Sequence, residues 1–447
     1  MDDIETRIGQ WRGYLSRRAV LHADDVAELE GHLRDQIERL EASGLSADEA
    51  FLIGVTRIGR INDLAGEYAR EHSDRLWKHL VLDETPEAAG RNGALLAIGL
   101  AVAAAVAIKL PALFGVDATG QGAEFYLRNV GLLVLPFVAT FFLVRRRASV
   151  ATIVTVAAGF VAAAVVMNAY PFAPAGQTAV LAGIHVLLAL WLVAGIAYAD
   201  GDVRSTSARM DVIRFSGEWF VYLVLLVLGG GVLSALTFAV FASIGLSPAV
   251  FVAEWLIPCG GAAAVVVAAW LVEAKQSVIE NIAPVLTRVF TPLFTLLLLA
   301  FIVAASLHGS FVEDGRELLI LFDAVLLVVV ALLLYSISAR TSLAPPTWFE
   351  KLQLLMIAAA LVVDVFVLVA MVGRIGEYGA SANKLASLGV NLILVANLAG
   401  AGWHHLRFVR GTGRFETVER WQTGFLPVYL AWAAVVVIVF PPVFGFV

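Results

Sequence analysis

Long apolar runs dominate this chain from Leu95 to its end. A helix needs about 20 apolar residues to cross the ~30 Å hydrocarbon core of a bilayer, and these runs reach that length repeatedly. Because hydrocarbon offers no water to satisfy backbone polar groups, runs of this kind must be helical. Charged residues make up 15% of the chain, against roughly 25% in soluble domains. The sequence therefore predicts an all-α integral membrane protein, a polytopic helical transmembrane bundle.

About eleven apolar segments qualify as membrane spans. Two contain helix-disrupting residues, Pro258 with Gly260–Gly261 in one and Pro292 in the other. We interpret both as kinks in continuous helices, with broken helices that build a substrate site as the alternative. The predicted spans are Ala94–Phe114, Leu127–Val144, Ala151–Met167, Ala179–Ala199, Phe220–Ile244, Val252–Leu271, Val289–Leu307, Leu318–Ile337, Leu352–Val372, Leu385–Trp403 and Leu426–Phe444.

Lys and Arg are distributed unevenly between the loops that join these spans. Alternate loops carry basic clusters such as Arg145–Arg147, whereas the remaining loops hold only Arg128, Arg316, Arg374 and Lys384. Cytoplasmic loops are the ones enriched in Lys and Arg. The asymmetry predicts a multi-pass protein of the bacterial cytoplasmic (inner) membrane, with a cytoplasmic N-terminus and an extracytoplasmic C-terminus.

The first 80 residues are polar and amphipathic. Apolar residues such as Val26, Leu29 and Leu33 recur at helical spacing, and Ser46 with Glu49 forms a capping-box pattern. Such stripes must bury their apolar faces against one another, so residues 1–80 are predicted to form a small cytoplasmic helical bundle, here called the head. Residues 81–93 are predicted as a polar linker, and residues 94–447 as the transmembrane domain.

The head also carries a recognisable pattern between Val26 and His72. The segment GLSADEA follows one helical stripe, and a glycine-containing turn and a helix with Tyr68 come after it. This pattern resembles the permease-prefix or HAAS-type helical domain of bacterial membrane proteins. The resemblance implies a signalling or coupling role, with a PadR-type regulator or a permease subunit as the cytosolic partner of residues 1–80. It implies no activity.

Several polar residues lie within or beside the predicted spans. A charge at the centre of a bilayer costs at least ~2.5–3.5 kcal/mol, so Asp364 should be paired, neutral or in contact with water. We interpret the group as an outward-open polar cavity that binds a cation, a proton or a small polar solute, and the alternative is a structural tie between helices. The candidate substrate- or ion-binding residues are Asp364, Arg374, Glu377, Lys384, Asn391, Asp323 and Glu254.

The predicted span Leu385–Trp403 has a broad polar side. Lys384 and Asn391 are seven residues apart, as are Asn397 and His404, so each pair shares one helical stripe. This side is expected to face the bundle interior. His404 and His405 are interpreted as interface anchors, with proton transfer as the alternative.

The polar loop before the last span is the expected docking surface for the head. Ion pairs and one aromatic ring would mediate the contact, and exposed pairs contribute only ~0–1 kcal/mol each, so docking would be reversible. The candidate docking residues are Arg414, Glu419, Arg420 and Trp421.

A second resemblance covers Ser216–Val447. It rests on the blocks YSISAR (Tyr335–Arg340), RIGEYGASANKLASLGVNL (Arg374–Leu392), NLAGAG (Asn397–Gly402) and RFETVERWQTGFLPVY (Arg414–Tyr429). These blocks are similar to a large, uncharacterised family of bacterial polytopic membrane proteins. The resemblance implies fold and membrane location, without an activity. The family more often has arginine where Lys384 stands.

Enzyme signatures are absent from the sequence. It contains no phosphate-binding Gly-x-x-x-x-Gly-Lys-Ser/Thr loop and no His-Glu-x-x-His pair, and no Gly-x-Ser-x-Gly elbow. We expect no enzymatic activity, no cofactor and no metal site. The first hypothesis is a transporter-like or permease-like protein with a cytosolic regulatory head. The alternative is a membrane sensor that relays an envelope signal to a cytosolic partner through that head.

Overall fold

A computed structural model describes residues 86–116, 122–243, 247–274, 282–308, 316–340 and 344–447, together with a few positions between 30 and 50. The chain divides into two compact units, Met1–Ala89 and Gly90–Val447. The helical bundle predicted for residues 1–80 lies almost entirely outside the described residues. The described helices from Gly90 onward belong to the second unit.

Every regular element in the described part of the chain is a helix. The elements are α4 (Pro86–Lys109), η1 (Leu110–Phe114), α5 (Ala123–Arg145), α6 (Val150–Ala169), α7 (Gln177–Tyr198), α8 (Thr206–Ser243), α9 (Ala249–Phe251), η3 (Val252–Leu256), α10 (Ile257–Ala274), α12 (Ile282–His308), α13 (Arg316–Ser338), α14 (Trp348–Tyr378), α15 (Ala382–Val409), α16 (Phe415–Ile438) and α17 (Phe440–Val443).

The prediction of an all-α polytopic bundle is confirmed. Among the described residues, ten helices are long and apolar enough to cross a membrane. The shorter apolar stretch Phe322–Ser338, within α13, lies where the remaining span was predicted. Helix α4 begins at Pro86, inside the segment predicted as a linker.

Polar caps define where several of these helices start. Ser149 accepts a hydrogen bond from the backbone N–H of Thr152 at the start of α6. Thr347 begins α14 with a capping box completed by Glu350. Such caps satisfy backbone donors that have no partner inside the helix. Helix α14 ends at Tyr378 and is followed by Gly379, whose φ of 74° favours glycine.

The interruption at Pro258 is a helical irregularity within one span. The π-helical turn η3 leads directly into α10, and Ala249–Ala274 runs as a single apolar helix. Pro258 has no N–H to offer the carbonyl of Glu254 four residues earlier. That carbonyl instead accepts a hydrogen bond from Lys109 Nζ at 2.8 Å. The neighbouring helix α4 thus satisfies the backbone group that the proline leaves free.

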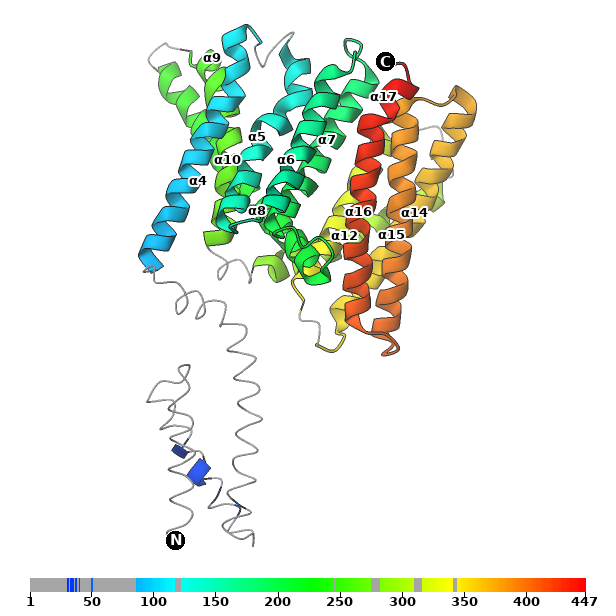
Figure 1. Cartoon of the computed structure of the whole chain (residues 1–447). Coiled ribbons are helices and arrows are strands. Elements are labelled where there is room, and N and C mark those ends of the chain that lie inside the picture. Colours follow the sequence, from blue (N-terminus) through cyan, green and yellow to red (C-terminus); the bar gives the residue numbers. More distant parts are fainter. Residues whose placement is uncertain are drawn as a thin grey trace. The chain divides into compact units, whose positions relative to one another are not determined.

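The helices form two groups with separate cores. The first group, α4–α7 with α10, packs around a core that includes Phe141 and Phe142. The second group, α12–α16, packs around Leu326, Val363 and Leu398. The start of α8 joins both cores, and α7 packs against α16. Figure 1 shows the first group in blue to green and the second in yellow to red.

The two sides of this bundle differ in charge. On one side, the basic loops meet: Arg146 pairs with Glu273 at 2.9 Å, and Arg214 donates to the carbonyl of Ser338. We call this the basic side. The chain ends on the opposite side, the C-terminus side, where the Phe446 and Val447 carbonyls accept hydrogen bonds from Ala173 and Thr178. The loops predicted to share one face of the membrane therefore lie together.

Apolar side chains cover much of the bundle's outer surface. On α8 alone, Phe220, Leu228 and Val232 are all exposed. Contiguous apolar exposure on this scale fits contact with lipid rather than with water. The lipid bilayer is therefore the partner that the surface supports.

Candidate functional site

A pocket of about 610 Å³ lies on the C-terminus side, between the two helix groups. Helix α7 of the first group contributes Gln177, Val180, Leu181 and Ile184 to its wall. The opposite wall comes from α13, α14 and α15 of the second group. Small-molecule sites typically enclose roughly 300–1,000 Å³, so the pocket is large enough for a metabolite-sized solute.

Two predicted cations line this pocket. Arg374 belongs to the end of α14, and Lys384 belongs to the first turn of α15. Lys384 Nζ donates to the carbonyl of Gly379 at 2.8 Å and to that of Arg374 at 3.4 Å. Neither side chain forms an ion pair with a carboxylate of the described residues. Both cations thus retain positive charge toward the pocket.

A carboxylate lines the same pocket from the third helix. Asp323 of α13 accepts a hydrogen bond from Asn391 Nδ2 at 2.9 Å. The same amide group donates to the carbonyl of Ser387 and contacts Met371 Sδ at 3.5 Å. The Asn391 side chain is fully buried. Asp323 is therefore held in one orientation by a residue that cannot reach solvent.

Asp364 lies deeper, on the interior face of α14. Its side chain is 0% exposed, and neither carboxylate oxygen has a hydrogen-bond partner among the described residues. Asp323 is the charged group that acts on it electrostatically. Asp364, Met371 and Arg374 follow one another at helical spacing along α14. The predicted residue Asp364 thus lies next to the pocket residues without lining the pocket itself.

The other two predicted binding residues lie apart from the pocket. Glu254 belongs to η3 in the first helix group, and Glu377 is exposed near the end of α14. The structure thus brings together Asp323, Arg374 and Lys384, with Asn391 and Asp364 behind them. In the described part of the chain, no group of three or more His, Cys, Asp or Glu residues is placed to hold a metal ion.

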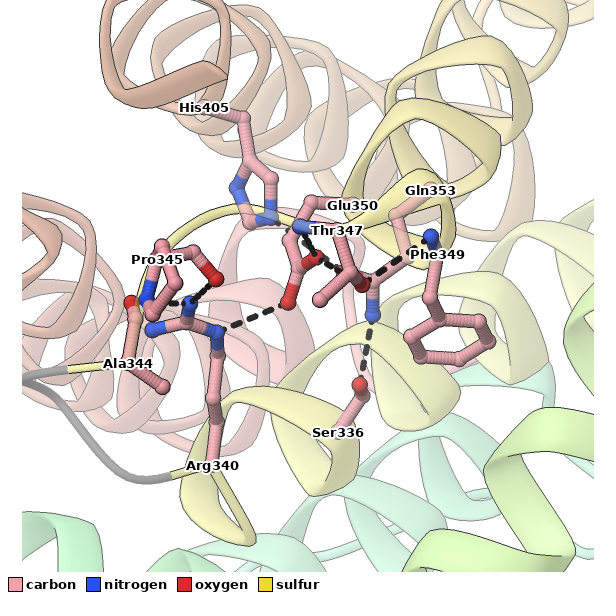
Figure 2. A network of polar contacts seen from close by, with 9 residues as sticks. All are labelled: Ser336, Arg340, Ala344, Pro345, Thr347, Phe349, Glu350, Gln353 and His405. Atoms are coloured by element: carbon pink, nitrogen blue, oxygen red, sulfur yellow. Dashed lines mark hydrogen bonds and ion pairs between the residues drawn. The ribbon is translucent and has the colours of Figure 1, made fainter. Parts of the chain in front are cut away.

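A second polar network occupies the basic side of the same three helices (Figure 2). Arg340, just after α13, donates from Nε to Glu350 Oε1 at 2.7 Å. Its Nη2 donates to the carbonyls of Ala344 and Pro345 at 2.6 and 3.0 Å. Glu350 Oε2 accepts from both the N–H and the hydroxyl of Thr347 at 2.6 Å. One arginine therefore fixes the connection between α13 and α14.

The Arg340 guanidinium also packs against two aromatic rings. It lies 4.7 Å from the centroid of Phe408 at the end of α15 and 4.4 Å from that of Phe415 at the start of α16. Guanidinium groups favour such positions over aromatic faces. Arg340 consequently ties four helix ends together on the basic side.

The Arg340 network extends inward through Gln353 of α14 (Figure 2). Its amide nitrogen donates to the Ser336 hydroxyl at 2.5 Å, and its amide oxygen lies 3.4 Å from His405 Nε2. His405 is 0% exposed, so its interpretation as an interface anchor is wrong. The sequence alone did not reveal that His405 is buried, because its neighbours Trp403 and His404 are of residue types expected at the membrane interface. The informative signal is spacing: His405 follows Asn391 by two heptads, on one stripe of α15.

The predicted docking residues lie at and after the start of α16. Arg414 and Arg420 are exposed and Glu419 is half-buried. Trp421 packs against α15, where a Cβ on Gly400 would lie 2.0 Å from its ring, and its Nε1 donates to the Asn397 carbonyl. The ring thus fills the α15–α16 contact. Docking of the head stays a prediction, because the head lies outside the described residues.

No protein-family model, curated protein or solved structure matches this chain. The resemblances of Val26–His72 and Ser216–Val447 to bacterial families therefore stay predictions. The geometry of the pocket and of the polar residues behind it is therefore the basis for a proposed function.

Proposed function

We propose that this protein is a transporter-like or permease-like membrane protein that binds a small polar solute in the pocket on its C-terminus side. The observation that carries the proposal is the composition of that pocket. Arg374 and Lys384 supply positive charge, Asp323 supplies negative charge, and aliphatic residues of α7 complete the wall. Charged residues within or beside membrane-spanning helices are costly and are typical of substrate or ion pathways.

The position of the pocket supports a transport role in particular. It lies between α7 of the first group and α13–α15 of the second on the C-terminus side, beside the contact of α7 with α16, and α8 joins helices on the basic side. There Arg214 donates to the Ser338 carbonyl of α13, and Arg209 donates to the Thr423 carbonyl of α16. A polar pocket at the interface of two helix groups is a typical position for the substrate site of a transporter.

The lining also favours a class of solute. A carboxylate or phosphate of the solute would meet Arg374, an ammonium would meet Asp323, and an aliphatic portion would lie against Val180, Leu181 and Ile184. A zwitterion with an apolar side chain, such as a neutral amino acid, has all three features. Hydrogen bonds between charged partners are roughly twice as strong as neutral ones, so both charges should matter.

Matched solutes test this assignment. We would measure thermal unfolding of the detergent-purified protein with leucine, with leucine methyl ester, which lacks the anion, and with 4-methylpentanoate, which lacks the cation. A ligand at 100 times its Kd stabilises the folded state by about 2.7 kcal/mol. Leucine should stabilise the wild-type protein more than either fragment. Equal responses to all three, or none, would contradict the zwitterion class.

Pocket variants separate specific binding from a general solute effect. Arg374→Gln should weaken the response to leucine and leave the response to the methyl ester. Asp323→Asn should also weaken the response to leucine, but it should leave the response to 4-methylpentanoate. Glu377→Gln is the control, because Glu377 is exposed and does not line the pocket. Uptake of a stabilising solute into proteoliposomes then tests transport. Binding without uptake would favour the alternative, a membrane sensor.

The proposal includes the predicted orientation and regulation. The basic side would face the cytoplasm of a bacterial cell and the pocket would load from outside. Residues 1–80 would regulate access through a cytosolic partner such as a PadR-type regulator or a permease subunit. A full-length protein that captures neither partner from its own cytosol would count against this regulatory part alone.

A further inference from the structure

Asp364 is a buried carboxylate of the predicted site that does not line the pocket. It lies at the middle of α14, flanked on the same face by the buried residues Ala360, Val363 and Val367. Both of its oxygens lack a hydrogen-bond donor among the described residues. An ionised carboxylate normally accepts several donors. Its surroundings therefore provide nothing that would stabilise a negative charge.

Among the described residues, the helices that pack against α14 bring no cation to Asp364. From α13 the facing charge is Asp323, which has the same sign. The charged or titratable residues described on α15, such as Lys384 and His405, lie toward its two ends, and its neutral amide Asn391 contacts Met371, about two turns along α14 from Asp364. The described charged side chain of α12, Arg288, is exposed near the basic side. An ion at Asp364 would thus be buried beside a second negative charge.

We propose that Asp364 is a proton-binding site, occupied in this conformation and coupled electrostatically to solute binding at Asp323. A buried acidic group without partners avoids the desolvation penalty by holding its proton. The proton stays on a carboxylate oxygen and no covalent bond other than O–H is involved. Because the side chain is sealed from solvent, proton exchange requires the helices to rearrange, as they would when access alternates.

The direction of coupling follows from the two charges. Loss of the Asp364 proton would place two negative charges close together, and an ammonium group bound at Asp323 would offset one of them. Solute binding and proton release should therefore favour one another. Coupling between sites is reciprocal, so a bound proton should weaken binding of a cationic group in the pocket. This consequence rests on the proposed function, whereas the protonated state of Asp364 does not.

Infrared spectroscopy tests the protonated state without any solute. We would compare wild-type protein and Asp364→Asn at neutral pH in lipid, and record the C=O band of protonated carboxyl groups. The variant should lose one such band, and Asp323→Asn should retain it. Loss of carboxylate bands in Asp364→Asn, with the C=O band unchanged, would show that Asp364 is ionised and would overturn the proposal.

Two further measurements keep the test decisive. If Asp364→Asn fails to fold, the wild-type band itself can be followed after transfer to D₂O, where a sealed proton should exchange far more slowly than one on a surface carboxyl. Immediate exchange would contradict a sealed site. Adding Na⁺ to a Na⁺-free sample should leave the C=O band in place. If carboxylate absorption replaced the C=O band instead, the coupled cation would be Na⁺ rather than a proton.

Leucine binding separates failure of this inference from failure of the proposed function. Leucine affinity of the wild-type protein should rise with pH, and Asp364→Asn should remove most of that dependence while leaving affinity measurable. Solute binding with an unchanged pH profile in the variant would contradict coupling and leave the pocket intact. A protonated Asp364 without any leucine binding would contradict the solute assignment alone.

Discussion

The two sides of the α13–α14–α15 unit differ in whether their charged side chains form ion pairs. On the basic side, Arg340 and Glu350 are paired at 2.7 Å, with side chains only 12% and 6% exposed. On the C-terminus side, Arg374 and Lys384 face a pocket and have no carboxylate partner among the described residues. The same three helices therefore satisfy their charges internally at one end and present them at the other. This contrast separates groups that hold the fold from groups available to a ligand.

Sequence position explains why the two sides differ. Arg340 and Glu350 bracket the short connection between α13 and α14, so the helix cap at Thr347 delivers the carboxylate to the guanidinium. Arg374 and Lys384 bracket the turn between α14 and α15, where the nearby carboxylate of Glu377 is exposed and forms an ion pair with neither cation. The Gly379 carbonyl accepts from Lys384, but a carbonyl does not neutralise a cation.

The largest expected effect is a difference in chemical accessibility. In a Cys259→Ala background, Ser387→Cys lines the pocket and should react readily with a charged, water-soluble thiol reagent. Ser338→Cys is 1% exposed on the basic side and should stay unmodified in the folded protein. Mass spectrometry of the labelled protein measures both. Equal labelling would show that the basic side opens as freely as the pocket.

The same pair of variants tests orientation. An impermeant reagent added to intact cells should modify Ser387→Cys if the C-terminus side is extracytoplasmic. Modification only after the cells are broken would reverse the predicted topology.

Arg340→Ala should destabilise the fold by about 3–5 kcal/mol, because it leaves Glu350 buried without its cation. The matched change on the other side, Arg374→Ala, should alter stability by no more than about 0.5 kcal/mol. Denaturant unfolding in detergent measures both. Replacing Arg340 and Glu350 together by Met should recover much of the loss, and comparable costs for the two single arginine variants would remove the contrast.

Two buried amides provide an intermediate comparison. Gln353→Leu removes the partner of Ser336 and His405, and Asn391→Leu removes the donor to Asp323. Each should cost about 1–3 kcal/mol, the penalty for leaving buried polar groups unsatisfied. Only Asn391→Leu should also weaken solute binding, since Asp323 lines the pocket. An equal loss of binding in Gln353→Leu would mean that the two networks are coupled.

The smallest effect is expected where a basic-side pair is exposed. Arg414 and Glu416 form an ion pair at 2.9 Å, with side chains 79% and 46% exposed. Arg414→Ala should change the unfolding free energy by about 0–1 kcal/mol. The measurement is the same unfolding curve used for Arg340→Ala. A large loss of stability in Arg414→Ala would show that ion pairs on the basic side stabilise the fold whether or not they are buried.

Local patterns predicted much of this molecule. Apolar length placed the spans, and the polar residues from Asp323 to Asn391 marked the pocket end of the second group. Two of the candidates, Glu254 and Glu377, lie away from it, because membrane depth does not specify which neighbour a side chain faces. Arg340, Glu350, Gln353 and His405 were missed as a site, since their importance depends on burial and pairing across three helices.

The sequence by itself determined that this chain forms a multi-helix membrane bundle, because the bilayer demands long apolar helices whatever they pack against. It also determined which loops share a side, through the alternation of basic clusters with each crossing. Only the tertiary structure decided which charges meet. Within the described residues, Asp364 has no hydrogen-bond partner and Arg340 has several, because helix packing brings together residues that are distant in sequence and so sets what surrounds each side chain.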